Sequence, residues 1–288
     1  MATRKIAILT DSSSSLDYLD YDLDNMYMFR LPIFFGSQEY IDGETINLDE
    51  FYHKLETEED IPTTSQPSLG QVVEMYEQLI KEGYTDIIHF PISKGLSGSY
   101  QSAFTAKSMI EDDINIEIVD IKTTAVILGY IVGESARLAK DGKSVEEIIE
   151  FATKHVESYN VRFMVEDLTY LVKNGRLSNA SAFIGNMLKI KPILEFNNEG
   201  NIIGSQKIRT TKKAIKYIVE EMIKASNEQQ KVLYFVSYSK DQEIRKKLEV
   251  EIESKGINLS QVLFCPLPSV IGAHIGNSLV AFGYFVTE

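Results

Sequence analysis

A turn rich in serine and glycine carries the side chains most able to bind an anion. Residues 93–100 read Ser-Lys-Gly-Leu-Ser-Gly-Ser-Tyr, after an apolar run over 87–92 and before a helix that begins near residue 98. Ligands of open α/β folds bind at the carboxyl ends of strands, and helix N-termini offer unpaired N–H groups to phosphate or carboxylate. The same residues also suit a flexible turn that caps the helix, and their types favour neither interpretation.

A second hydroxyl-rich turn spans residues 62–68, directly before a helix predicted over 69–80. Ser68 suits the N-cap of that helix, so capping accounts for it. Thr64 and Ser65 lie farther upstream than a cap requires. These two hydroxyls therefore remain available to a ligand.

Three further side chains are candidates for contact with an anion. His274 is flanked by glycines, which predicts a tight loop that presents the imidazole, although a lone histidine is more often structural. Arg176 lies on a turn, and the planar fork of arginine suits carboxylate and phosphate. Arg209 belongs to a basic cluster over 207–216 in a chain of net charge −13. Charged runs are usually solvated, but this cluster opposes the net charge and favours an anion or an acidic partner surface.

Several motifs of catalysis and nucleotide binding are missing from the sequence. It contains neither G-x-x-x-x-G-K-[ST] nor a G-x-G-x-x-G after a strand. The nucleophile elbow G-x-S-x-G is missed by one position, because Ser99 stands where its second glycine belongs. A serine hydrolase that uses Ser93 or Ser97 with His274 is therefore a weak alternative. A protein that binds a small phosphorylated metabolite in a polar cleft is another.

Composition excludes several classes of function. The 288 residues are 44% hydrophobic and 25% charged, as in soluble globular proteins, and the net charge of −13 argues against a nucleic-acid partner. Cys265 is the only cysteine, so no disulfide forms within the chain, and no ligand spacing predicts a metal site. No signal-peptide core and no apolar run of about 20 residues occur, so we expect a cytoplasmic protein without stable membrane insertion.

The order of apolar runs predicts two α/β domains, residues 1–157 and 158–288. Strands alternate with helices in the first domain, which predicts a mainly parallel sheet with strands over 5–10, 26–35, 87–92 and 116–119. In the second, a hairpin signal between 192–196 and 202–205 predicts a mixed sheet. No low-complexity linker separates the halves, so a ligand site is expected between or beside them.

Along essentially its whole length the chain resembles the DegV family, the fatty-acid-binding subunits of bacterial fatty acid kinase. The segments that carry the resemblance occur in a fixed order, namely Leu9–Ser12, Thr64–Ser68, Ser93–Tyr100, Leu168–Leu171, Gly175–Ser178, Lys191–Leu194, Arg209–Thr210 and His274–Gly276. Each segment alone is weak, but together they are highly specific.

The resemblance implies that a long-chain fatty acid lies in an internal tunnel, with no further cofactor. Its carboxylate would meet the hydroxyls of Thr64 and Ser93 and the imidazole of His274, and none of these would be catalytic. Arg176 and Arg209 would assist phosphate handling and docking of a kinase. That separate subunit would bring ATP and Mg²⁺ and form an acyl phosphate for phospholipid synthesis.

The energetics of burial agree with this expectation. About 15 methylenes at about 0.8 kcal/mol each would contribute on the order of 12 kcal/mol before association costs. The tail would therefore supply affinity, and the head-group residues would supply donors that a desolvated carboxylate needs. The sequence departs from the family pattern at Ile121, Asn174 and Asn277–Ser278, and none of these departures removes a proposed carboxylate ligand.

Overall fold

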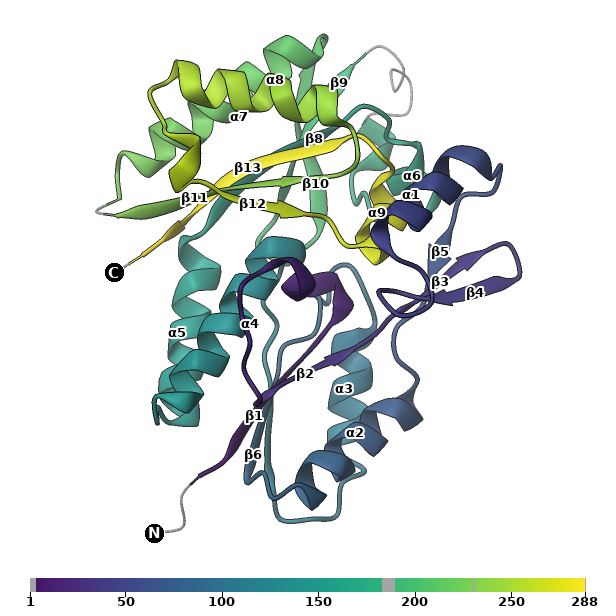
Figure 1. Cartoon of the computed structure of the whole chain (residues 1–288), viewed down its shortest axis with the longest axis vertical. Coiled ribbons are helices and arrows are strands. Elements are labelled where there is room, and N and C mark those ends of the chain that lie inside the picture. The colour runs from purple at the N-terminus through teal and green to yellow at the C-terminus, as the bar shows by residue number, and fades with distance from the viewer. Residues whose placement is uncertain (1–3, 183–189, 230, 288) are drawn as a thin grey trace.

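The computed structural model describes residues 4–182, 190–229 and 231–287. Figure 1 shows a parallel sheet in the lower half of the molecule and a larger sheet above it. The parallel sheet has the strand order β2-β1-β6-β7. Its strands are β1 (Ile6–Asp11), β2 (Met26–Phe29), β6 (Asp86–His89) and β7 (Asn115–Ile118). The mainly parallel first sheet predicted from the sequence is thus confirmed.

Helices cover both faces of this sheet, as a parallel sheet requires. On one face Leu9 and Ile87 pack with Tyr76 of α2, and on the other Ile8 and Ile88 pack with Leu128 of α4. The helices around this sheet are α2 (Leu69–Lys81), α3 (Ser99–Lys107), α4 (Ala125–Lys140) and α5 (Val145–Ser158). The predicted cap of α2 is confirmed, because the Ser68 hydroxyl accepts a hydrogen bond from the backbone of Gln71.

The second sheet has six strands in the order β10-β9-β8-β13-β11-β12. They are β8 (Asn160–Val165), β9 (Lys191–Phe196), β10 (Ile202–Ile208), β11 (Val232–Tyr238), β12 (Leu263–Pro266) and β13 (Leu279–Val286). Neighbours are antiparallel except β11 and β12, so the predicted mixed sheet and the β9–β10 hairpin are confirmed. β13 lies in the middle of the sheet, between β8 and β11. Helices α7 (Thr211–Ser226) and α8 (Gln242–Ser254) cover its outer face (Figure 1).

The single strand predicted over 26–35 is wrong. The chain leaves the parallel sheet after Phe29 and enters a separate antiparallel sheet at Pro32. Between them, the Leu31 N–H donates to Ser12 Oγ at 3.2 Å, and Pro32 has no N–H to offer a strand partner. The small sheet contains β3 (Pro32–Phe35), β4 (Gln38–Ile41) and β5 (Thr63–Thr64). Because residues 26–35 are mainly apolar throughout, the hydrophobic pattern does not indicate this change of sheet.

Three helices without a sheet of their own lie beside the small sheet. They are α1 (Leu48–Thr57), α6 (Thr169–Lys173) and α9 (Ser269–Ile275). Helix α9 contacts both α1 and α6. The predicted domain boundary at 157/158 falls at the end of α5 and stays a prediction, because one buried core runs through both halves of the chain.

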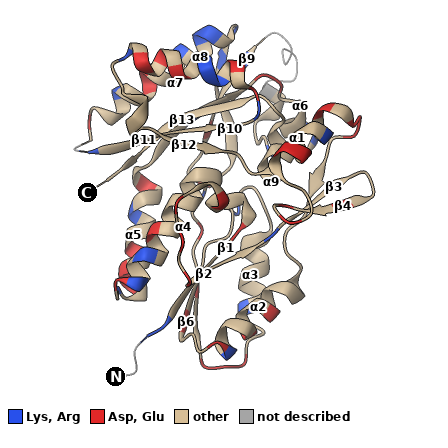
Figure 2. Ribbon diagram, in the orientation of Figure 1, with Lys and Arg blue, Asp and Glu red and all other residues tan. Residues whose placement is uncertain are grey.

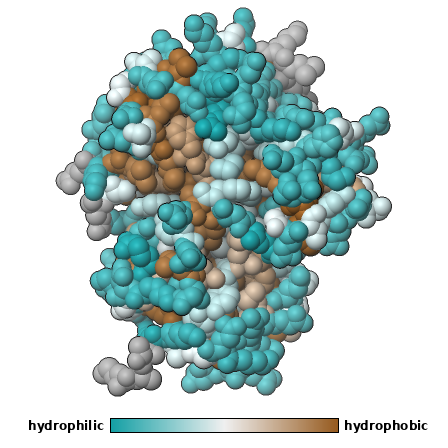
Figure 3. Space-filling view, in the orientation of Figure 1, coloured by the Kyte–Doolittle hydropathy of each residue, from teal (hydrophilic) through white to brown (hydrophobic). Residues whose placement is uncertain are grey.

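Charged residues lie mainly on the outer helices, for example α5, α7 and α8 (Figure 2). The strands between the helices are largely uncharged in the same view. Figure 3 shows apolar surface gathered around β11 and β12, at one edge of the six-stranded sheet. The candidate site lies between the two sheets.

Candidate functional site

A cavity of about 460 Å³ lies between the carboxyl ends of the parallel strands and the inner face of the six-stranded sheet. This volume is in the usual range for small-molecule sites. Most of the side chains that line it are apolar. Its position agrees with the rule that ligands of open α/β sheets bind beyond the carboxyl ends of strands.

The roof of the cavity follows from the two-residue period of strands. Phe163, Phe235 and Ala281 lie on neighbouring strands and face the cavity. Their chain neighbours Val236 and Phe282 face the opposite side and pack in the core beneath α7 and α8. The alternation thus gives one sheet two apolar faces, one for a helix layer and one for a ligand.

A buried carboxylate holds the floor of the cavity together. The Asp11 side chain, at the end of β1, accepts hydrogen bonds from Ser13 N and Ile92 N, each at 3.0 Å. Burial raises the pKa of Asp11. Thr124 Oγ1 donates to the Ser13 carbonyl at 3.1 Å. These bonds fix the loops after β1 and β6 and the start of α4, which together present Ser13, Ile92 and Thr124 to the cavity.

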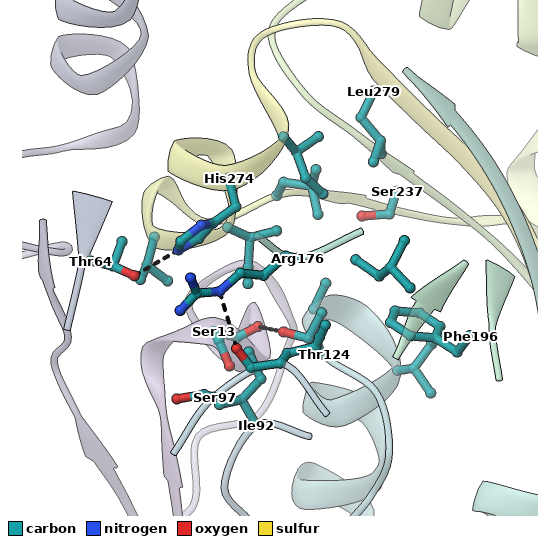
Figure 4. A pocket seen from close by; sticks show the side chains of 18 of the residues that line it. Ser13, Thr64, Ile92, Ser97, Thr124, Arg176, Phe196, Ser237, His274 and Leu279 are labelled. Atoms are coloured by element: carbon teal, nitrogen blue, oxygen red, sulfur yellow. Dashed lines mark hydrogen bonds between the residues drawn. The ribbon is translucent and has the colours of Figure 1, made fainter. Parts of the chain in front are cut away.

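Polar side chains gather at one end of the cavity. Thr64 Oγ1 lies 2.7 Å from His274 Nε2, and His274 Nδ1 is buried without a hydrogen-bond partner. Whichever ring nitrogen carries the proton, the pair keeps one spare donor for a ligand, on Thr64 or on His274. Figure 4 shows both side chains, with Arg176 beside them, at the end opposite Phe196. This end therefore suits an acceptor group such as a carboxylate.

His274 lies in the last turn of helix α9, so the tight loop predicted around it is wrong. Two glycines allow the arrangement in different ways. Gly272 lies inside the helix, where an added Cβ would come within 2.7 Å of the Phe51 ring. Gly276 ends the helix with a φ of +84°, a conformation that favours glycine. A seven-residue helix with an internal glycine carries too little periodicity to be recognised in the sequence.

Arg176 supplies positive charge at the same end. Its Nε donates to the Leu96 carbonyl at 3.4 Å, and its Nη1 donates to the Asn174 carbonyl. The Asn174 amide in turn donates to the Ala273 carbonyl at 3.1 Å, next to His274. Burial, and then the Arg176 charge, lower the pKa of His274 to about 4. The imidazole is thus neutral near pH 7, and Arg176 is the cation of the site.

Ser93, predicted as a carboxylate ligand, is not brought to the cavity. Its side chain is fully buried, donates to the Gly200 carbonyl at 2.9 Å and accepts from Gly95 N at 3.2 Å. Ser97, one turn later, lines the cavity instead. Both serines belong to the same hydroxyl-rich turn, but Ser93 fastens that turn to the β9–β10 hairpin. The predicted contact of Ser93 with a carboxylate stays a prediction, and Ser97 is the serine of this turn that lines the cavity.

Comparison with known proteins places the chain in a family. The family model DegV, described as an uncharacterised protein family, matches residues 5–287. A DegV domain-containing protein of Staphylococcus aureus is 35% identical over 97% of both chains. The chain belongs to the DegV family.

Solved structures of DegV proteins share the whole fold. A fatty-acid-binding DegV family protein from Streptococcus agalactiae is 32% identical, with a TM-score of 0.91 over 99% of this chain and 100% of that one. DegV of Bacillus subtilis, described as a fatty acid binding protein, is 31% identical, with a TM-score of 0.84 over 99% of this chain and 100% of its own. These neighbours confirm the α/β fold class predicted from the sequence.

The remaining predicted residue, Arg209, lies outside the DegV cavity. It is exposed between β10 and α7, and its predicted role in phosphate or kinase contact stays a prediction. Conversely, Ser13, Thr124 and Ser237 line the cavity but were not singled out in the sequence. The serine run over 12–15 after β1 is a signal for Ser13, because ligands of open α/β folds bind at the carboxyl ends of strands.

The described residues contain neither a cluster of metal ligands nor a helix that could span a membrane. Within residues 4–182, 190–229 and 231–287, no three His, Cys, Asp or Glu side chains are placed to hold a metal ion together. In the same part of this DegV chain, no helix combines the length and the apolar character needed to cross a membrane.

Acid should destabilise the lipid-free DegV protein partly through His274. Its pKa is about 4 when folded and about 6.5 when unfolded, so between these values the unfolded state binds more protons and folding stability falls as pH falls. The group accounts for about 3 kcal/mol at most. We expect His274→Asn to lose less stability than the wild type between pH 6.5 and pH 4 in urea unfolding. Burial raises the pKa of Asp42 to about 6, so this carboxyl changes folding stability with pH in the opposite direction. Asp42 is present in both proteins and therefore does not affect the comparison. If the free energies of unfolding of the two proteins fall equally with pH, the imidazole of His274 is not held neutral by the fold.

Proposed function

We propose that this DegV protein binds one long-chain fatty acid in the cavity and presents its carboxylate to a separate ATP-dependent kinase subunit. The observation that carries the proposal is the one-sided polarity of the cavity. Thr64, Arg176 and His274 lie at one end, and apolar side chains line most of the remainder. The Streptococcus agalactiae and Bacillus subtilis relatives, which are described as binding fatty acids, support the same ligand class.

Tail and head group would contribute differently to binding. Each buried methylene is worth about 0.8 kcal/mol, so the tail supplies most of the affinity. The carboxylate would leave water and need donors in its place, because an unpaired buried charge is costly. Arg176 would neutralise it, while Ser97 and the Thr64–His274 pair would donate hydrogen bonds. Fixed donors of this kind hold the carboxylate in one orientation.

The chemistry proposed for the partner explains why orientation matters. One carboxylate oxygen would attack the γ-phosphorus of the ATP that the kinase holds, the bond to ADP would break, and an acyl phosphate would form. Positioning of the nucleophile is a major contribution to such transfers. The sequence of this chain has no phosphate-binding motif of its own, which agrees with a division of labour between two subunits.

The two alternative functions receive less support from the geometry. A hydrolase would need a serine hydrogen-bonded to His274, but Ser93 bonds to Gly200 and Ser97 lies 2.9 Å from Ser99 Oγ. In the part of the chain that the structure describes, no carboxylate bonds to His274 Nδ1, the orienting contact of a catalytic triad. A phosphorylated metabolite would require a polar cleft, and this cavity is mainly apolar.

Native mass spectrometry of the purified protein tests the function directly. We expect an added mass that corresponds to one long-chain fatty acid and that disappears after organic extraction. The extracted protein should take up palmitate in about equal molar amount. A protein that carries no lipid and takes up none from detergent-free solution would contradict the proposal.

Arg209 gives a test of the kinase part of the proposal. Arg209→Ala should leave lipid content unchanged but lower the rate of acyl-phosphate formation about threefold to tenfold at low salt, because exposed charges accelerate encounter with an oppositely charged partner. Added salt should bring the wild-type rate toward that of the variant. Arg137→Ala is the control, since Arg137 is a surface arginine on α4 that pairs with Glu134 at 2.6 Å. Equal rates for all three proteins would contradict a role in docking.

A further inference from the structure

The cavity ends at a thin partition formed by two side chains. Phe196 and Val161 line the cavity described above and also a second cavity of about 480 Å³. The second cavity differs in chemistry, because its wall is mainly polar. Its charged and amide side chains are Lys122, Glu157, Asn160, Arg162, Asn197 and Asn198. An apolar compartment and a polar one thus meet at a single wall.

The partition stands at the far end from the proposed carboxylate site. Figure 4 shows Phe196 on the side of the cavity opposite Thr64 and His274. Phe196 is the last residue of β9, and its ring packs on Phe163 with 5.6 Å between the centroids. Val161 is buried near the start of β8, the antiparallel neighbour of β9. Both side chains therefore come from the same end of the sheet and are held by packed neighbours.

We propose that Phe196, supported by Val161, sets the longest acyl chain that the protein accepts. The proposal rests on the proposed function, since it concerns the tail of the same ligand. A tail that fits within the first cavity is buried entirely among apolar groups. A longer tail would have to displace Phe196 and enter a compartment whose amides and charges would lose water without gaining partners. The ring therefore imposes an upper limit on length, independent of the head-group contacts.

The test is the chain-length profile of lipid-free protein and its Phe196→Ala variant. Saturated acids from laurate to behenate are titrated against a bound fluorescent fatty acid. In the wild type, affinity should rise with length, reach a maximum and fall. In Phe196→Ala the maximum should move to longer acids. The space of the lost ring would admit additional methylenes among apolar groups, each worth up to about fourfold, so arachidate should bind about tenfold more tightly relative to palmitate. Val161→Ala should shift the profile in the same direction but less.

Phe282→Ala is the matched control. Phe282 lies on the same sheet but faces the opposite side, stacked on Tyr234, so its truncation removes the same atoms without touching either cavity. Its profile should match that of the wild type even if stability falls. Binding of acids by every protein with an unchanged maximum in Phe196→Ala and Val161→Ala would overturn the partition. Absence of fatty acid binding by the wild type would instead overturn the proposed function.

Discussion

Replacement of Ala281 by phenylalanine should lower the affinity for palmitate by about a hundredfold. Ala281 lies in the middle of the cavity roof, paired across the sheet with Ser237 on β11 and Phe163 on β8, which also line the cavity. A phenyl ring there would occupy space that the tail needs. Displacement of about four methylenes costs about 3 kcal/mol of binding free energy. Titration of the lipid-free variant with palmitate measures the loss.

The same variant should not be less stable when it is free of lipid. Its ring enters the cavity, where it adds apolar contacts instead of overpacking the core. Ser237→Ala is the control, because it changes the same part of the roof without filling it and should keep wild-type affinity. A folded Ala281→Phe protein that binds palmitate as tightly as the wild type would show that the tail lies elsewhere.

Loss of the Arg176 guanidinium should raise the pKa of the bound carboxyl group. A neighbouring cation favours the charged form of an acid and lowers the pKa of that acid. Arg176→Ala should therefore raise the carboxyl pKa by about one to two pH units, which corresponds to the loss of about one hydrogen bond to a charged group. The carbon-13 resonance of carboxyl-labelled palmitate, followed against pH in the complex, reports this value. The rate of acyl-phosphate formation with the kinase subunit should fall with it.

Two further arginine variants separate charge from geometry. Arg176→Lys keeps the positive charge but not the planar fork, so the carboxyl pKa should stay closer to that of the wild type while the rate still falls. Arg209→Ala removes an exposed charge outside the cavity and should leave the carboxyl pKa unchanged. If Arg176→Ala leaves the carbon-13 titration of palmitate unaltered, Arg176 does not contact the carboxylate.

The main sheets could be predicted from the sequence because most strands are short apolar runs that end in polar turns. The β9–β10 hairpin is an example, since its turn residues are explicit. The break between β2 and β3 could not be predicted, because it depends on a hydrogen bond from Leu31 to Ser12, and nothing local marks it except Pro32. Periodicity records burial, not which sheet a strand joins.

The candidate site was predictable in its residue types and less so in its exact members. Thr64 and His274 are 210 positions apart in the chain. Thr64 was a candidate because the helix cap does not need it, His274 because glycines flank it, and both because of the resemblance to the DegV family. Ser93 and Ser97 lie in the same turn, and the local sequence does not indicate which of them contacts a ligand. What separates them is a contact between Ser93 and Gly200, 107 positions away, which no local pattern encodes. Long-range packing thus decides which hydroxyl is structural and which faces the cavity.

The central place of β13 has a consequence for synthesis on the ribosome. β8 and β11 both precede β13 in the chain, yet each pairs with it in the finished sheet. Until β13 emerges from the exit tunnel, both strands expose unpaired edges, which are prone to aggregate. The roof over the cavity also lacks Leu279 and Ala281 until then. If the protein binds a fatty acid as proposed, lipid capture and completion of the sheet should therefore coincide after translation of this strand.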